Sequence, residues 1–342
     1  MDNTNIFSLL YQQNQYNKMA DQFGDKYLNG QLNVILNQVS IFAILMLIGF
    51  VGARTKVIPE ESLKYLAQMI VKIILPCLIF KVVAGSNITH QDFYASWKFA
   101  LAVAVLFSLL PVVGFFIGKF FKLTGTSLNV IIALITFGNM GFVGIPLINE
   151  VYHDPLAGVS ITVYTLIDMA LLWTFGVYLC SRHLNNQSVK NSIKNMLNPT
   201  TITLIFAMFI LFLNIKLPRV ILETVYGIGG TSKYLTMIYL GAALSFINHK
   251  GILKKAHIFV LAFFKMFIIP VAMFSLFRNF LPYVQSGILT IVSGLPTMTT
   301  IVMLAKNYES DDRLATETIF VTTVACLVAF PLVNIVNILL WG

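Results

Sequence analysis

Long apolar stretches separated by short polar segments dominate this sequence. Residues 34–51 and 202–213 contain no charged side chain. A helix needs about 20 largely apolar residues to cross a bilayer, whereas a β-barrel would show alternating segments of about ten residues. The pattern predicts an all-α polytopic membrane protein. Its ten expected spans are 34–53, 62–85, 97–118, 127–150, 156–181, 199–215, 220–247, 252–277, 284–306 and 314–340.

The spacing of the polar segments predicts two halves. The longest polar loop follows the fifth span and separates five helices from five. Because five is odd, related halves would insert in opposite orientations, as in many secondary transporters. We therefore expect two inverted five-helix repeats. The expected organisation is a polar N-terminal tail over 1–33, a first repeat over 34–181, a cytoplasmic loop over 182–198 and a second repeat over 199–342.

Composition supports a membrane protein, and the distribution of charge predicts how the chain is oriented in the membrane. Hydrophobic residues make up 57% of the chain, charged residues 11%, and the mean hydropathy is +0.81, against about 25% charged residues in soluble domains. The net charge of +9 comes from short basic clusters between spans, so we expect no nucleic-acid partner. Most lysines and arginines follow the odd-numbered spans, which predicts that those loops are cytoplasmic and both termini extracytoplasmic. The expected location is the plasma membrane.

Two spans contain residues that disfavour a continuous helix. The fourth includes "FGNMGFVGIP" at 137–146, and the ninth includes "SGLPTMTT" at 293–300. Proline removes a backbone donor and glycine permits open backbone angles, so each span is predicted to form two half-helices. The alternative is a glycine-lined packing seam with a proline kink. Pro111 in the third span and Pro270 in the eighth are further expected interruptions.

A broken span presents free N–H groups and the positive end of a helix dipole at mid-depth. If the two breaks cross, their half-helix ends converge on one point that would suit a carboxylate. Four predicted binding residues lie in each break. They are Asn139, Gly141, Gly144 and Pro146 in the first, and Pro296, Thr297, Thr299 and Thr300 in the second.

Four charged residues within predicted spans are candidates for a functional role, since a charge at mid-bilayer costs at least about 2.5 kcal/mol. Asp168 is the clearest, because it lies about 18 Å into the fifth span at 1.5 Å per residue. Lys72 or Lys265 could pair with it, and Glu317 is a rough counterpart of Asp168 in the second half. Asp168 is either a proton carrier or substrate contact, or a member of a static ion pair.

No residue pattern predicts a metal, a cofactor or an enzyme. Cys77, Cys180 and Cys326 all lie in apolar runs, and their spacing fits neither a zinc site nor a disulfide framework. The five histidines show no metal-ligand spacing, and no nucleophile elbow or phosphate-binding glycine loop is present.

The fourth span resembles the auxin efflux carrier family, which includes plant PIN carriers and bacterial malate permeases. Members of this family show the pattern Asn-x-Gly-Phe-x-Gly-x-Pro, matched here by Asn139, Gly141, Phe142, Gly144 and Pro146. The stretches "ILPCLIF", "YLGAALS" and "SGLPTMTTIVMLAKNYESD" resemble the second, seventh and ninth spans of the family, so the resemblance covers about 34–340.

The resemblance implies ten helices in two inverted repeats, with spans one, two, six and seven as a scaffold beside a moving domain. It also implies a carboxylate site at the crossing marked by Asn139, Pro146 and Pro296, and an elevator-like motion. One departure concerns the second break. Plant carriers place an asparagine beside the proline in both breaks, but Pro296 lies between Leu295 and Thr297, so threonine hydroxyls and backbone would complete the site.

These patterns favour a secondary active transporter of small organic anions, a mono- or dicarboxylate such as malate. Coupling to protons or sodium, or uniport driven by the membrane potential, remain open, as does a homodimer. The expected partners are the carboxylate and the lipid bilayer. The alternative is a channel or a membrane receptor for an anionic ligand, although neither a polar pore pattern nor a signalling domain is visible.

Overall fold

The computed structural model describes residues 33–84, 96–184, 199–213, 215, 217–246 and 251–341. Nearly all of the predicted tail over 1–33 and most of the predicted loop over 182–198 lie outside these residues. The all-α polytopic prediction is confirmed, since six helices are long and apolar enough to cross a membrane. These six are Asn33–Arg54, Ser62–Val83, Trp97–Phe120, Pro155–Ser181, Ala256–Phe277 and Asp312–Asn337.

Three of the long helices each contain one wide π-turn, through which the helix continues. Ser62–Val83 consists of α2 (Ser62–Met69), η1 (Ile70–Ile74) and α3, which extends over Leu75–Ala84. The two others have the same construction. They are α8 (Pro155–Leu171) with η3 (Leu172–Gly176) and α9 (Val177–Ser181), and α14 (Ala256–Phe263) with η5 (Phe264–Ile268) and α15 (Ile269–Phe277).

Proline positions explain three of the four π-turns in the described part of the chain, including one in the fourth span. Pro76, Pro146 and Pro270 each stand two residues after the end of a π-turn. Proline lacks an N–H group, and its ring clashes with the carbonyl four residues earlier, so a widened turn accommodates it within a continuing helix. The expected interruptions at Pro111 and Pro270 are therefore corrected. Pro111 lies inside the unbroken helix α5 (Trp97–Phe120), and the chain remains helical through Pro270.

Spans four and nine are broken as predicted. The fourth consists of α6 (Gly125–Thr136), a non-helical segment over 137–139, η2 (Met140–Gly144) and α7 (Ile145–Val151). The ninth consists of α16 (Tyr283–Ser293) and α17 (Thr299–Asn307), separated by 294–298. The glycine-rich seventh range divides into α12 (Arg219–Gly230) and α13 (Ser232–Phe246). The remaining helices are α11 (Pro199–Phe212), the short η4 (Ile252–Lys254) and α18 (Asp312–Trp341).

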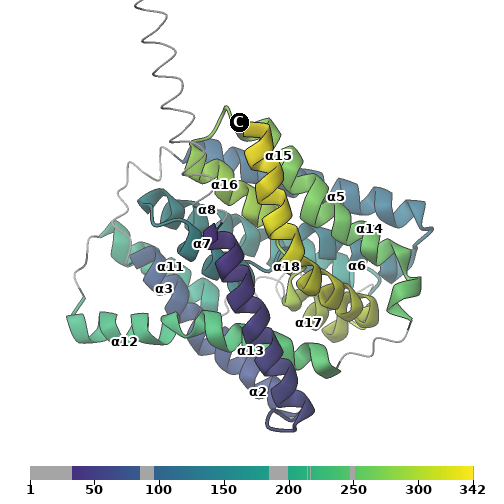
Figure 1. Cartoon of the computed structure of the whole chain (residues 1–342), viewed down its shortest axis with the longest axis horizontal. Helices are drawn as coiled ribbons and strands as arrows, with labels where there is room; N and C mark the ends of the chain where they lie inside the picture. The colour runs from purple at the N-terminus through teal and green to yellow at the C-terminus, as the bar shows by residue number, and fades with distance from the viewer. Residues whose placement is uncertain are drawn as a thin grey trace, which may run out of the picture.

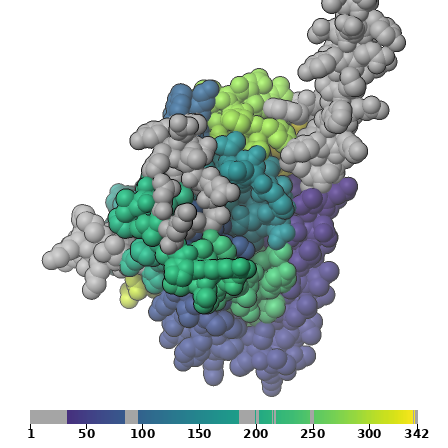
Figure 2. Space-filling model, turned by 90° about the vertical axis from the view of Figure 1, so that its left-hand side faces the viewer, coloured from purple at the N-terminus to yellow at the C-terminus, as the bar shows by residue number. Residues whose placement is uncertain are grey.

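The helices form two packing groups. In the first helix group, α3 packs against α11 and α12, α2 packs against α13, and the helix Asn33–Arg54 crosses α13 (Figure 1). In the second helix group, α5 contacts α6, α8, α14 and α16, while α18 contacts α6, α14, α15 and α17. Contacts of α3 with α8 and of α13 with η2 join the groups. Figure 2 faces the first helix group, with the purple and blue atoms of 33–84 beside the green atoms of α12 and α13.

Two glycines allow the first helix to approach α13 closely. A Cβ added at Gly49 would lie 1.9 Å from the carbonyl oxygen of Ile238, and one added at Gly241 would lie 1.9 Å from that of Met46. Small residues of this kind let helix backbones approach in a membrane, where packing rather than the hydrophobic effect drives association. The crossing therefore depends on the absence of a side chain on both helices.

The described ends of the chain lie near each other. Ile35 near the start of the first helix and Asn337 near the end of α18 line the same small cavity. An even number of membrane crossings would bring both ends to one face in this way.

Candidate substrate-binding site

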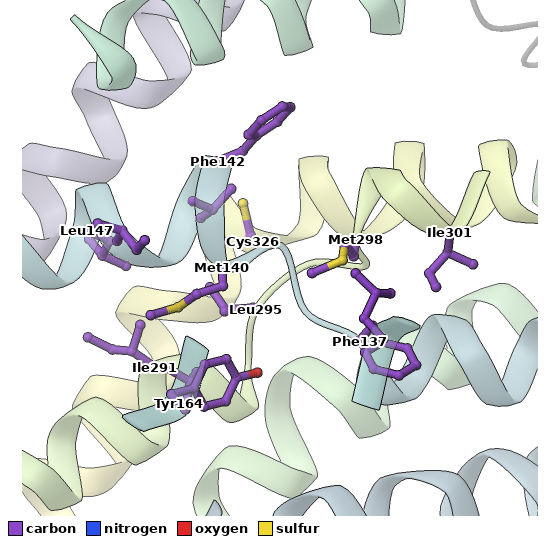
Figure 3. Packing of buried hydrophobic residues seen from close by; sticks show 14 of the residues in the cluster. Phe137, Met140, Phe142, Leu147, Tyr164, Ile291, Leu295, Met298, Ile301 and Cys326 are labelled. Atoms are coloured by element: carbon purple, nitrogen blue, oxygen red, sulfur yellow. The ribbon is translucent and has the colours of Figure 1, made fainter. Parts of the chain in front are cut away.

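The two breaks meet inside the second helix group. Gly138 and Thr297 form an isolated antiparallel bridge. The Asn139 N–H donates to the carbonyl oxygen of Pro296 at 2.8 Å, and the Met298 N–H donates to that of Phe137 at 3.1 Å. Lipid offers no hydrogen bonds, so non-helical backbone at membrane depth has to be satisfied by protein or water. Each break thus supplies a hydrogen-bond partner to the other, and the adjacent loops at Phe137 and Met298 are visible in Figure 3.

The structure corrects the expected position of the first break. Helix α6 ends at Thr136 and η2 begins at Met140, so Pro146 lies inside the second half-helix rather than at the interruption. In the ninth span, by contrast, Pro296 lies within the non-helical segment. Gly144 has a packing role, because an added Cβ would lie 2.6 Å from the Met140 sulfur and 3.1 Å from a methyl carbon of Leu295.

Both half-helices that follow the breaks begin at the crossing. The Asn139 side-chain oxygen caps η2 by accepting a hydrogen bond from the Phe142 N–H at 3.3 Å. The nine-residue helix α17 begins at Thr299 without a side-chain cap. The initial N–H groups of a helix lack intrahelical partners, and the dipole there favours negative charge. Two positive helix ends are thus directed to one place.

A cavity of about 230 Å³ lies beside the crossing, between the two helix groups. The first group contributes η1, α3 and the start of α11, and the second contributes both breaks together with α8 and η3. Most of the wall is apolar. The polar or charged side chains on it are Lys72, Asn139, Thr165, Asp168, Trp173, Thr299 and Thr300.

Several buried polar atoms on this wall have no hydrogen-bond partner. They are Nδ2 of Asn139, Oγ1 of Thr165, both carboxylate oxygens of Asp168 and Nε1 of Trp173. Asp168 is fully buried, at 0% exposure. Most buried polar atoms in folded proteins have a partner, so a cluster of unsatisfied donors and acceptors around one cavity indicates a place for a bound polar molecule or water.

Thr165 and Trp173 were not among the residues predicted from the sequence. Thr165 precedes Asp168 by three residues and therefore shares its helix face. Trp173 follows Asp168 by five residues, which is the hydrogen-bond spacing of a π-turn, and it lies in η3. The first position could have been found from helical spacing, whereas the second depends on a π-turn that has no proline to signal it.

The predicted binding residues divide into two sets. Asn139, Gly141, Thr299 and Thr300 line the cavity. Pro296 and Thr297 lie at the crossing itself, whereas Gly144 and Pro146 lie in the half-helix that follows the first break. The Thr297 hydroxyl lies 2.9 Å from the Thr322 hydroxyl, and the Thr297 N–H donates to the same Thr322 oxygen at 3.2 Å.

The four predicted intramembrane charges also divide. Lys72 and Asp168 line the cavity. Lys265 is 1% exposed, and its ammonium donates to the carbonyl oxygen of Ile135 at 2.5 Å. Glu317 forms ion pairs with Lys255 and with Arg313, the latter at 3.1 Å, and near the start of α18 it lines a different cavity from Asp168.

A second cavity of about 510 Å³ leads from the crossing towards one face of the molecule. It lies between α2 and α13 of the first helix group and α17 and α18 of the second. Thr299 and Met303 belong to its lining as well as to that of the first cavity, and Glu60 and Arg313 lie on it as well. This route ends on the face predicted to be cytoplasmic.

Towards the opposite face, polar contacts join the two helix groups. Glu150 at the end of α7 accepts from the Lys233 ammonium of α13 at 2.6 Å and from the Gln38 amide of the first helix at 3.2 Å. Gln38 lies near the start of the first helix, whereas Glu60 follows its end. The second cavity therefore lies on the Glu60 side of the crossing, and the polar contacts between the helix groups lie on the Glu150 side.

Comparison with known proteins identifies the family. The model of the membrane transport protein family matches residues 34–334. The chain belongs to this family. It is the family of the auxin efflux carriers that the fourth-span motif resembles. The chain is also 24% identical over 307 residues to an uncharacterized transporter of Methanocaldococcus jannaschii, covering 87% of this chain and 97% of that protein. The protein is thus a membrane transporter and not an enzyme.

Proposed function

We propose that this transporter moves small organic anions by secondary active transport, with ten spans in two inverted five-helix repeats and the crossing as its binding site. One observation carries the proposal. Two broken spans meet beside a cavity whose wall holds unpartnered buried donors and acceptors. In transporters with inverted repeats, half-helix N-termini at the midplane bind anionic groups of the substrate.

The charges on the wall support a small carboxylate, such as a monocarboxylate or malate. The Lys72 ammonium, the unpartnered Asn139 amide and the first turn of α17 all offer donors to an anion. Apolar side chains, among them Leu75 and Met298, cover the rest of the wall. They would contact the carbon skeleton of the substrate.

The direct test of this function is uptake into proteoliposomes across a panel of labelled carboxylates, with and without a pH gradient. Saturable uptake of at least one carboxylate is expected. Uptake that rises linearly with concentration would instead indicate a channel, and no uptake of any carboxylate would overturn the proposal.

The two helix groups support an elevator-like motion in which the second group moves against the first. Such a motion has to break the contacts of Glu150 with Lys233 and Gln38, because these residues lie on opposite groups.

Glu150→Gln is accordingly expected to weaken closure on the Glu150 side, because the neutral amide loses the charge attraction to Lys233. Cysteines placed on that face should react faster with a membrane-impermeant thiol reagent in Glu150→Gln than in the unsubstituted protein. Glu223→Gln is a matched control, since Glu223 pairs with Arg219 within α12 at an exposed site. Equal labelling rates in all three proteins would remove Glu150 from this role.

Asp168 is proposed to carry the proton if transport is coupled to pH. Its carboxylate is fully buried on the cavity wall and has no hydrogen-bond partner, so binding or release of a proton there changes the charge that a substrate meets. Asp168→Asn is expected to retain carboxylate binding but to lose the effect of a pH gradient on uptake. The measurement is initial uptake rate at several gradients, and an unchanged dependence would assign coupling elsewhere.

A further inference from the structure

Lys265 occupies an unusual position at the end of a half-helix. Its ammonium donates to the carbonyl oxygen of Ile135, the penultimate residue of α6. In a continuous helix that carbonyl would accept from the N–H four residues later, which belongs to Asn139. Here the Asn139 N–H donates to Pro296 instead. The break thus leaves the Ile135 carbonyl without its helical partner, and the lysine replaces that partner.

The surroundings of this ammonium are those of a cation site. The C-terminal end of a helix carries partial negative charge, and α6 ends at Thr136. Asp168, fully buried on α8 and without a hydrogen-bond partner, is an acid whose charge acts on Lys265. Glu317 is the other buried carboxylate considered above, and it is paired with Lys255 and Arg313. A carbonyl oxygen at a helix C-terminus therefore holds one buried positive charge, and the charge of the unpartnered Asp168 carboxylate acts on it from beyond hydrogen-bond distance.

In transporters with broken helices, carbonyls of the unwound backbone and half-helix C-termini coordinate the sodium ion or proton that drives transport. We infer that the Lys265 ammonium stands in the position of a coupling cation, so that this transporter takes up its substrate without sodium. The inference rests on the proposed function and deepens it, because it states that sodium is not required for substrate uptake. A merely structural lysine would stabilise the same break but would leave no cation site when removed.

The inference predicts a gain of ion dependence when the ammonium is removed. Lys265→Ala leaves space beside the Ile135 carbonyl and removes the positive charge that acts on Asp168, so a small monovalent cation should bind there. In purified full-length protein, thermal unfolding of Lys265→Ala is expected at a lower temperature than that of the unsubstituted protein. NaCl should then raise its Tm in a saturable manner, and choline chloride at equal concentration should not.

The unsubstituted protein and Lys265→Arg provide the controls, since both keep a positive charge at this position. Neither should show a rise in Tm specific to sodium. Lys72→Ala is a second control, because it removes a different intramembrane lysine, one on the cavity wall, and should create no sodium response. A Lys265→Ala protein that responds to neither sodium, lithium nor methylammonium would overturn the inference.

Substrate uptake by the unsubstituted protein provides a second test, which does not depend on whether any variant folds. Equal rates in sodium and choline buffers are expected, and a requirement for sodium would overturn the inference even if Lys265→Ala does not fold. The two proposals fail differently. Absence of saturable uptake for every carboxylate would count against the proposed function, whereas the sodium dependence of Tm is measured without substrate.

Discussion

Replacing Asn139 by alanine is expected to reduce saturable carboxylate uptake by about 10- to 100-fold. A hydrogen bond to a charged group contributes about 1.5–3 kcal/mol, and the Asn139 Nδ2 is a buried, unpartnered donor of the cavity wall. The same side chain caps η2 through its oxygen, so the substitution also weakens the start of the half-helix, by about 1 kcal/mol for a typical N-cap. The measurement is initial uptake rate against substrate concentration.

The control for this experiment is Asn337→Ala. Asn337 is another buried asparagine with an unpartnered side-chain atom, but it lines the small cavity near the end of α18. It should keep nearly normal uptake with a comparable loss of thermal stability. If both variants lose uptake equally, the effect of Asn139 is structural, and the crossing loses its assignment as the binding site.

The largest effect on folding is expected from Gly241→Ala. The added Cβ would lie 1.9 Å from the Met46 carbonyl oxygen, a distance that no relaxation of a side chain can relieve, because the clash is with backbone. The first helix and α13 have to separate, and overpacking of this kind costs about 1–3 kcal/mol or more. We expect a marked fall in Tm and in the yield of monodisperse protein, measured by fluorescence-detected size-exclusion chromatography.

Gly227→Ala in α12 is the matched control. A Cβ added there meets nothing within 4 Å, and alanine is favoured over glycine in a helix by about 1 kcal/mol. Its stability should be unchanged or slightly raised. A Gly241→Ala protein as stable as Gly227→Ala would show that the first helix does not approach α13 as closely as described.

The sequence located the two breaks, but it did not show which prolines end a helix. Glycine, asparagine and proline weaken helices through local backbone terms, so the interruptions near 137–146 and 293–300 are visible without neighbours. Whether a proline ends a helix is not local. Pro111 lies within one unbroken helix and Pro146 follows a π-turn, because a helix continues wherever packing and wider turns accommodate the missing donor.

The roles of the buried charges depended on contacts between distant segments. Glu317 and Asp168 are similarly placed in sequence, yet Glu317 forms ion pairs with Lys255 and Arg313, while Asp168 lines the cavity. Lys265 was a candidate partner of Asp168, and its hydrogen bond to the Ile135 carbonyl crosses 130 residues of sequence. No spacing along the chain predicts such a bond.

The sequence by itself determined that this protein lies in a membrane, that it is helical, and that two of its spans are interrupted. These properties follow from the free energy of transferring each segment from water into the bilayer and from its backbone preferences, neither of which depends on the rest of the chain. Only the tertiary structure decided that the Gly138 and Thr297 segments hydrogen-bond to each other, that a cavity forms beside them, and that Glu150 joins the two helix groups. Those features arise between segments far apart in the chain, where geometry rather than composition sets which groups meet.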